Sequence, residues 1–254
     1  MRPGLVLALY LCATPLALGT ASPPAMVLLP AGTYLPLFSE PNRRGDLKAP
    51  EVKSLPVEVS AFLLDRRPVT NLEFLDFTMR HPEWRRSRVS SLFSESQYLK
   101  HWKNDSRLAS VSDGARPVTF VSWFSARAYC ESRGDSLPTN DQWEYALADQ
   151  GRSSFMTRDK ILRWYSSPNS KVLAPASSGG MNGFGIQNLY GLVWEWTLDF
   201  NGTLIGDESF CGGGAQNALD ASDYSAFMRY SFRGSLKAKY VVGNLGFRCA
   251  RKAG

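Results

Sequence analysis

One long stretch of this chain, residues 151–187, has little hydrophobic periodicity and is rich in Gly, Ser, Asn and Pro. Irregular segments of this length are uncommon inside a compact domain, and they are either disordered or held by side chains and ions. The chain has no internal repeat and no low-complexity linker. The sequence therefore favours one irregular domain in which short helices and strands are joined by long loops.

Short elements are predicted on both sides of this stretch. Residues 26–38 alternate and turn like a strand, a turn and a strand, and residues 57–64 also favour a strand. Three helices are predicted to start at hydroxyl N-caps, namely at Thr70 with Glu73 in a capping box, at Ser122 or Ser125, and at Thr139 with Gln142 at the third position. Pro82 should end the first helix, and residues 85–115 should form short helices and loops.

The N-terminus has the pattern of a secretory signal peptide, which we assign to residues 1–21. One Arg precedes an apolar run from Leu5 to Leu18, and small residues follow. The run is short for a membrane span and Pro follows it closely. The alternative is a buried N-terminal helix. We expect an exported protein, periplasmic or secreted, with no membrane span after cleavage.

Charge and histidine content exclude two classes of function. The formal net charge is +6, but Lys and Arg are spread along the chain, and the densest cluster, residues 81–89, is short and contains a Glu. A scattered distribution is typical of a solvated surface rather than of a surface that binds the phosphates of nucleic acid, so nucleic acid is not an expected partner. Because His81 and His101 are the only histidines, a three-histidine iron or zinc site is impossible.

The cysteine content suits an oxidising compartment. Loss of the signal peptide would remove Cys12 and leave Cys130, Cys211 and Cys249. Three cysteines without C-x-x-C spacing are a weak zinc pattern. In an oxidising compartment they favour one disulfide and one spare thiol.

Five motifs occur in an order that resembles one known family. They are RRPVTNLEF (66–74), PVTFVSWFSARAYC (117–130), LPTNDQWEYALA (137–148), NGFGIQNLYGLVWEW (182–196) and NLGFRCAR (244–251). Together they resemble the formylglycine-generating enzyme, or sulfatase-modifying factor, family over residues 26–251. The resemblance implies one α+β domain with a C-type-lectin-like variant fold: a small twisted antiparallel sheet, two helices and high loop content.

The resemblance also implies a disulfide. In the family, the helix ending in AYC is commonly tied to the terminal GFRC, which here pairs Cys130 with Cys249. A bond that closes so long a loop contributes roughly 4–5 kcal/mol in the chain-entropy model. The alternative is two free buried thiols.

A structural calcium site is implied for the segment NLYGLVWEW. Asn188 would supply a side-chain oxygen, Gly191 and Val193 backbone carbonyls, and Glu195 its carboxylate. Oxygen ligands of this kind suit Ca²⁺. Family members usually have Asn where this chain has Leu192. The alternative is that Glu195 binds no metal and only caps a loop through hydrogen bonds.

The family's catalytic cysteines have no counterpart. Relatives oxidise a substrate cysteine to formylglycine with two cysteines that bind copper(I), placed five residues apart before an Arg-rich strand. Alignment on the arginines puts Ser225 at the second position and residues 217–220 near the first. Cys211 is a single thiol, and one thiolate is half of a two-thiolate site. We therefore expect no copper and no copper-dependent formylglycine formation.

Three hypotheses follow for function, and whether the protein is an enzyme stays open. The first is an exported maturation or accessory factor that binds a protein or peptide client in the family's surface groove. The second is an oxidoreductase with a re-tooled groove, similar to the pyoverdine-maturation oxidases of the same superfamily. Membership of another branch of this superfamily, the ergothioneine-type sulfoxide synthases, is excluded because those enzymes need a longer chain and more histidines. The third hypothesis is a lectin-like module that binds a ligand through the Trp-rich face around Trp194, although such tryptophans are usually core.

The candidate groove residues are Asp220, Asp223, Ser225, Arg229, Tyr230 and Cys211. Such a cluster can hold an anion or move protons. The alternative is that Asp220 and Asp223 cap a helix and that Arg229 is a structural ion-pair partner. Cys211 lacks a histidine nearby in the sequence, which favours a small buried thiol.

Overall fold

A computed structural model describes residues 24–34, 56–149, 162–164, 166–167, 172–201 and 221–254. The predicted signal peptide, Asp220 and Cys211 lie outside these ranges. No helix among the described residues is long and apolar enough to cross a membrane.

Short β-strands form three small sheets. Strand β4 (Phe62–Asp65) pairs antiparallel with β1 (Met26–Leu29) on one edge and with β7 (Ala250–Lys252) on the other. Strand β2 (Gly32–Tyr34) pairs antiparallel with β3 (Val57–Val59). The strand–turn–strand prediction is confirmed, but its two strands pair with later strands rather than with each other.

The third sheet is parallel and connects two distant motifs. Strand β5 (Trp194–Glu195) pairs in parallel with β6 (Leu245–Gly246). The expectation of a single antiparallel sheet is therefore too narrow. The pairing places Glu195 beside the chain that leads to Arg248, because β6 ends two residues before that arginine.

Three helices begin where hydroxyl caps predict them. Helix α1 (Asn71–Arg80) and helix α3 (Asn140–Ala148) both start with capping boxes, on Thr70 with Glu73 and on Thr139 with Gln142. Ser122 rather than Ser125 caps helix α2 (Trp123–Ser132). Each cap oxygen satisfies a backbone N–H that a helix leaves unpaired, so a local motif is enough to set the start. Pro82 follows α1 and opens a short 3-10 helix (Pro82–Trp84). A second 3-10 helix (Val111–Ala115) lies within residues 85–115, where short helices and loops were predicted.

A further helix, α5 (Ala221–Ser235), replaces the Arg-rich strand that the resemblance implied. That expectation, and the count of two helices, were wrong. The physical reason lies in the spacing of Arg229 and Arg233, which one helical turn places on the same face. The alternative that Asp220 and Asp223 mark a helix start agrees with the observed first residue of α5.

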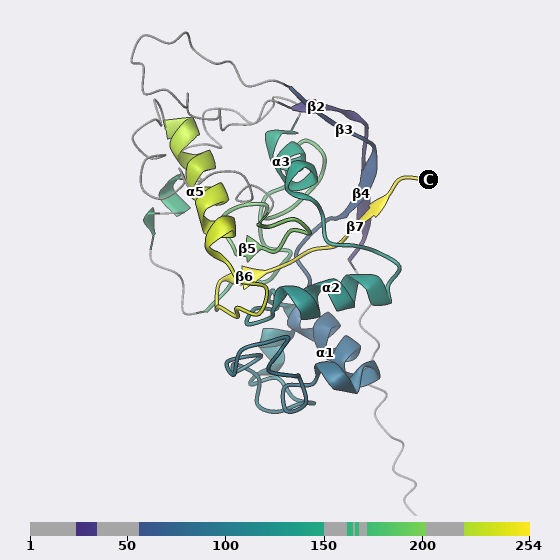
Figure 1. Ribbon diagram of the computed structural model, residues 1–254, viewed down its shortest axis with the longest axis vertical. Coiled ribbons are helices and arrows are strands. Elements are labelled where there is room, and N and C mark those ends of the chain that lie inside the picture. Colours follow the sequence, from purple (N-terminus) through teal and green to yellow (C-terminus); the bar gives the residue numbers. More distant parts are fainter. Residues whose placement is uncertain (1–23, 35–55, 150–161, 165, 168–171, 202–220) are drawn as a thin grey trace, which may run out of the picture.

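The core joins these elements. Figure 1 shows the β1-β4-β7 sheet on one side, α5 on the opposite side and α3 between them, with α1 and α2 at one end. Phe74 of α1, Tyr129 of α2 and Phe247 pack ring against ring in the larger apolar cluster. The Cys130–Cys249 disulfide, predicted from the resemblance, is formed beside them and ties α2 to the chain entering β7.

Candidate functional site

The described half of α5 directs two arginines at one carboxylate of α3. Arg229 donates from Nε and from its second terminal nitrogen to Glu144, at 3.0 Å to Oε1 and 2.8 Å to Oε2. Arg233 donates to Glu144 Oε1 at 2.8 Å. The exposed fractions are 1% for Arg229, 3% for Arg233 and 4% for Glu144. The three side chains therefore form a buried ion cluster, called here the α3–α5 charge cluster.

This cluster keeps Glu144 ionised. Burial alone would raise the pKa of the Glu144 carboxyl, but the charges and hydrogen bonds of Arg229 and Arg233 outweigh it and hold that pKa below its usual range. Guanidinium groups do not deprotonate in proteins. The α3–α5 charge cluster therefore has no member that exchanges a proton near neutral pH.

Two tyrosines beside the cluster are also fixed in one protonation state. Burial raises the pKa of Tyr34 and of Tyr230 well above the ordinary value, and in both cases a neighbouring negative charge adds to the effect. The Tyr34 hydroxyl donates to Asp141 Oδ1 at 2.8 Å, and Tyr230 is hydrogen-bonded to Tyr34. Both phenols are therefore neutral donors, suited to holding structure rather than to accepting protons.

The structure describes the side chains of only some of the predicted groove residues. Arg229 and Tyr230 lie buried against α3, which agrees with the structural ion-pair alternative for Arg229. Ser225 lies in the first half of α5, whose side chains are not among those described. Asp220 and Cys211 fall outside the described residues, so their roles stay predictions.

One tryptophan links the α3–α5 charge cluster to a second buried ion pair. The guanidinium carbon of Arg233 lies 4.5 Å from the centre of the Trp143 ring. The Trp143 indole N–H donates to Glu195 Oε2 at 2.9 Å. Cation–π contacts of this kind are strongest where water is excluded, as here. A single side chain therefore positions charges on both sides of α3.

Glu195, the carboxylate between two tryptophans in the sequence, has an arginine partner. Arg248 donates from Nε to Glu195 Oε2 and from its terminal nitrogen to Oε1, each at 2.7 Å. Neither side chain has any exposed surface. Arg248 also donates to the carbonyl oxygens of Asp65 and Gln187. A buried bidentate pair with these further bonds satisfies both charges.

These contacts bear on the calcium prediction. Both Glu195 oxygens already accept hydrogen bonds, and the Asn188 amide donates to the Ala176 carbonyl at 2.7 Å. Among the described residues there is no group of three or more His, Cys, Asp or Glu side chains that could hold a metal. The hydrogen bonds of Glu195 agree with the alternative in which this carboxylate is satisfied without a metal. Calcium at Asn188, Gly191, Val193 and Glu195 stays a prediction that this structure does not test.

Sequence reasoning missed Glu144 and Arg248. A charged residue inside an otherwise apolar motif is the signal that was present for both, in QWEYALA and in LGFRCA. Fully buried charges occur almost only with a partner. The two motifs therefore contained a signal for buried ion pairs, but not the identity of the partner residues.

Comparison with known proteins identifies the relatives. Residues 15–253 match the family described as "Sulfatase-modifying factor enzyme 1-like domain". A mouse protein named inactive C-alpha-formylglycine-generating enzyme 2 is 31% identical over 294 residues, covering 98% of this chain and 93% of the relative. The bovine formylglycine-generating enzyme is 26% identical over 288 residues, covering 91% and 76%. The solved structure of CarF superposes with a TM-score of 0.52 at 15% identity, covering 91% of this chain and 99% of CarF, which supports the fold alone.

Proposed function

The chain belongs to the sulfatase-modifying factor enzyme 1-like family, and we propose that it is an accessory member that binds a protein or peptide client without oxidising it. The client is a cysteine-bearing segment of a sulfatase, the class of protein in the family's description. The proposal keeps the binding function of the scaffold and removes the copper chemistry.

The number and the pairing of the cysteines are the main support for this proposal. The chain has four cysteines, and Cys130 and Cys249 are joined to each other. This leaves Cys12 and Cys211, which lie outside the described residues, and Cys12 belongs to the predicted signal peptide. Copper(I) sites of the family type need two thiolates, and Ser225 stands at one of the two aligned positions.

The buried charges support the same conclusion. An oxidoreductase with a re-tooled groove needs groups that accept and release protons, and the α3–α5 charge cluster commits Arg229, Arg233 and Glu144 to one another. The relative with 31% identity is itself named inactive. The disulfide fits an oxidising compartment, so we include export in the proposal.

A labelled cysteine-bearing peptide from a sulfatase tests the proposal. We expect the peptide to raise fluorescence anisotropy saturably, and a scrambled peptide of the same composition to leave it unchanged. Mass spectrometry after incubation with copper(I) and oxygen should recover the cysteine intact. Absence of saturable binding would overturn the client proposal. Conversion of the cysteine to an aldehyde would instead show that the protein is an enzyme.

A further inference from the structure

Positive charge is concentrated in the loops that follow α1. Residues 85–107 contain six Lys or Arg and two Asp or Glu, a net +4 in a chain whose total is +6. All of these residues are described, and the segment lies apart from α3 and α5, beside α1 in Figure 1. Although Lys and Arg occur along the whole chain, this segment therefore carries a local excess of positive charge.

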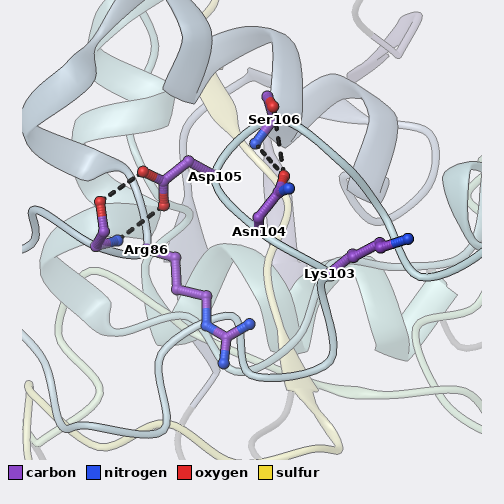
Figure 2. Close-up of a pocket in the computed structure, with 6 residues that line it drawn as sticks. Arg86, Lys103, Asn104, Asp105 and Ser106 are labelled. Carbon is purple, nitrogen blue, oxygen red and sulfur yellow. Dashed lines mark hydrogen bonds between the residues drawn. The ribbon is translucent and has the colours of Figure 1, made fainter.

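Two of these loops line a pocket of about 620 Å³ that is largely open to solvent. Pockets of about 300–1,000 Å³ hold small-molecule ligands. Every lining residue has a polar or charged side chain: Arg86, Ser87, Lys103, Asn104, Asp105 and Ser106 (Figure 2). Such a lining suits a charged, hydrogen-bonding group better than an apolar one.

Hydrogen bonds fasten the two loops together and fix the pocket. The backbone N–H and the hydroxyl of Ser87 donate to the two oxygens of Asp105, at 2.9 and 2.5 Å. Arg86 donates from one terminal nitrogen to the Trp102 carbonyl at 2.6 Å, and Trp102 is buried. A site held by its own scaffold before the ligand arrives loses less entropy on binding.

The one carboxylate in the lining is already engaged. Burial alone would raise the pKa of Asp105, but the Ser87 hydrogen bonds and the charges of Arg85 and Arg88 lower it. The Asp105 carboxylate accepts two hydrogen bonds from Ser87, and in Figure 2 it points away from Lys103. Asp105 is therefore ionised, and its charge is offset by neighbouring arginines rather than by the pocket's own cations.

The cations of the pocket retain donors for a ligand. Within the described part of the chain, Arg86 uses one guanidinium nitrogen for Trp102, and the Lys103 ammonium has no hydrogen-bond or ion-pair partner. Arginine offers a planar fork that matches an oxyanion, and lysine adds a compact positive charge. Ser106 and Asn104 add neutral polar groups at the same rim.

We propose that this pocket binds a sugar-sized molecule that carries a sulfate or phosphate monoester, with Arg86 and Lys103 supplying the positive charge of the site. The volume is larger than an inorganic anion needs, which leaves room for the group that carries the ester. The pocket lining contains none of the candidate groove residues, and the proposal stands independently of the client-binding function.

Titration calorimetry of the whole protein with glucose 6-sulfate and glucose 6-phosphate tests the site. Neutral glucose is the ligand control, and the stronger of the two esters identifies the source of the oxyanion. Lys103→Met and Arg86→Gln should each weaken binding roughly tenfold, in the range for one charged hydrogen bond. Arg107→Gln removes the same charge from the same segment outside the lining and should change affinity little.

Two results would overturn the proposal. One is equal weakening by Lys103→Met and Arg107→Gln, which would mean that general positive charge attracts the ester. The other is no binding of either ester by the unaltered protein. Because Lys103 is exposed, its variant should fold even if Arg86→Gln disturbs the loop that holds Trp102.

Discussion

Replacement of Glu144 by Gln is expected to destabilise the protein by about 3–5 kcal/mol, the cost of breaking a buried ion pair from one side. The change removes the negative charge that both buried guanidinium groups contact, while keeping nearly the same shape and volume. Urea unfolding followed by circular dichroism would measure the loss as a lower midpoint with an unchanged slope.

A surface pair in the same protein provides the matched control. Glu131 pairs with Arg127 one helical turn away on α2, and both side chains are about half exposed. Exposed pairs of this type contribute about 0.3–0.5 kcal/mol, so Glu131→Gln should be nearly neutral. If Glu144→Gln were equally neutral, Arg229 and Arg233 would not depend on Glu144. The hypothesis that these arginines serve a reactive groove would then regain its basis.

Removal of the disulfide should have a comparable effect. The bond joins residues separated by 119 positions, and the chain-entropy model assigns roughly 4–5 kcal/mol to a loop of that length. The double variant Cys130→Ala with Cys249→Ala should therefore unfold at a much lower temperature than the unaltered protein, measured by calorimetry without reductant.

Cys211→Ser is the control for the disulfide variant, because it removes a thiol and leaves the bonded pair intact. We expect its melting temperature to match that of the unaltered protein, and we expect reductant to lower the melting temperature of both. A double variant that melts with the unaltered protein would show that this bond contributes little to stability. The covalent link between α2 and the chain entering β7 would then not be a source of the protein's stability.

Some of this fold was predictable because its determinants are local. The caps at Thr70 and Thr139 sit within three residues of the groups that they satisfy, so the sequence was sufficient to place α1 and α3. Strand pairing was not predictable in this way. Strand β4 takes partners from both ends of the chain, and no short pattern near Phe62 encodes either partner.

The candidate site was harder to predict than the fold. The spacing of Arg229 and Arg233 suits one face of a helix, but a strand was inferred there from the resemblance. Glu195 was expected to need a cation, and the cation found in the structure is Arg248, 53 positions away in the sequence. Ion pairs between distant residues depend on tertiary packing, which neither composition nor periodicity contains.

Copper(I) titration of the purified protein against a competing chelator decides between an accessory protein and a copper enzyme. With Cys130 and Cys249 bonded to each other, we predict no stoichiometric copper binding, and the same result for the Cys211→Ser variant. One equivalent of tightly held copper in the unaltered protein, lost in Cys211→Ser, would contradict this. It would mean that Cys211 and a second ligand form a copper site, and that the protein retains the chemistry of its active relatives.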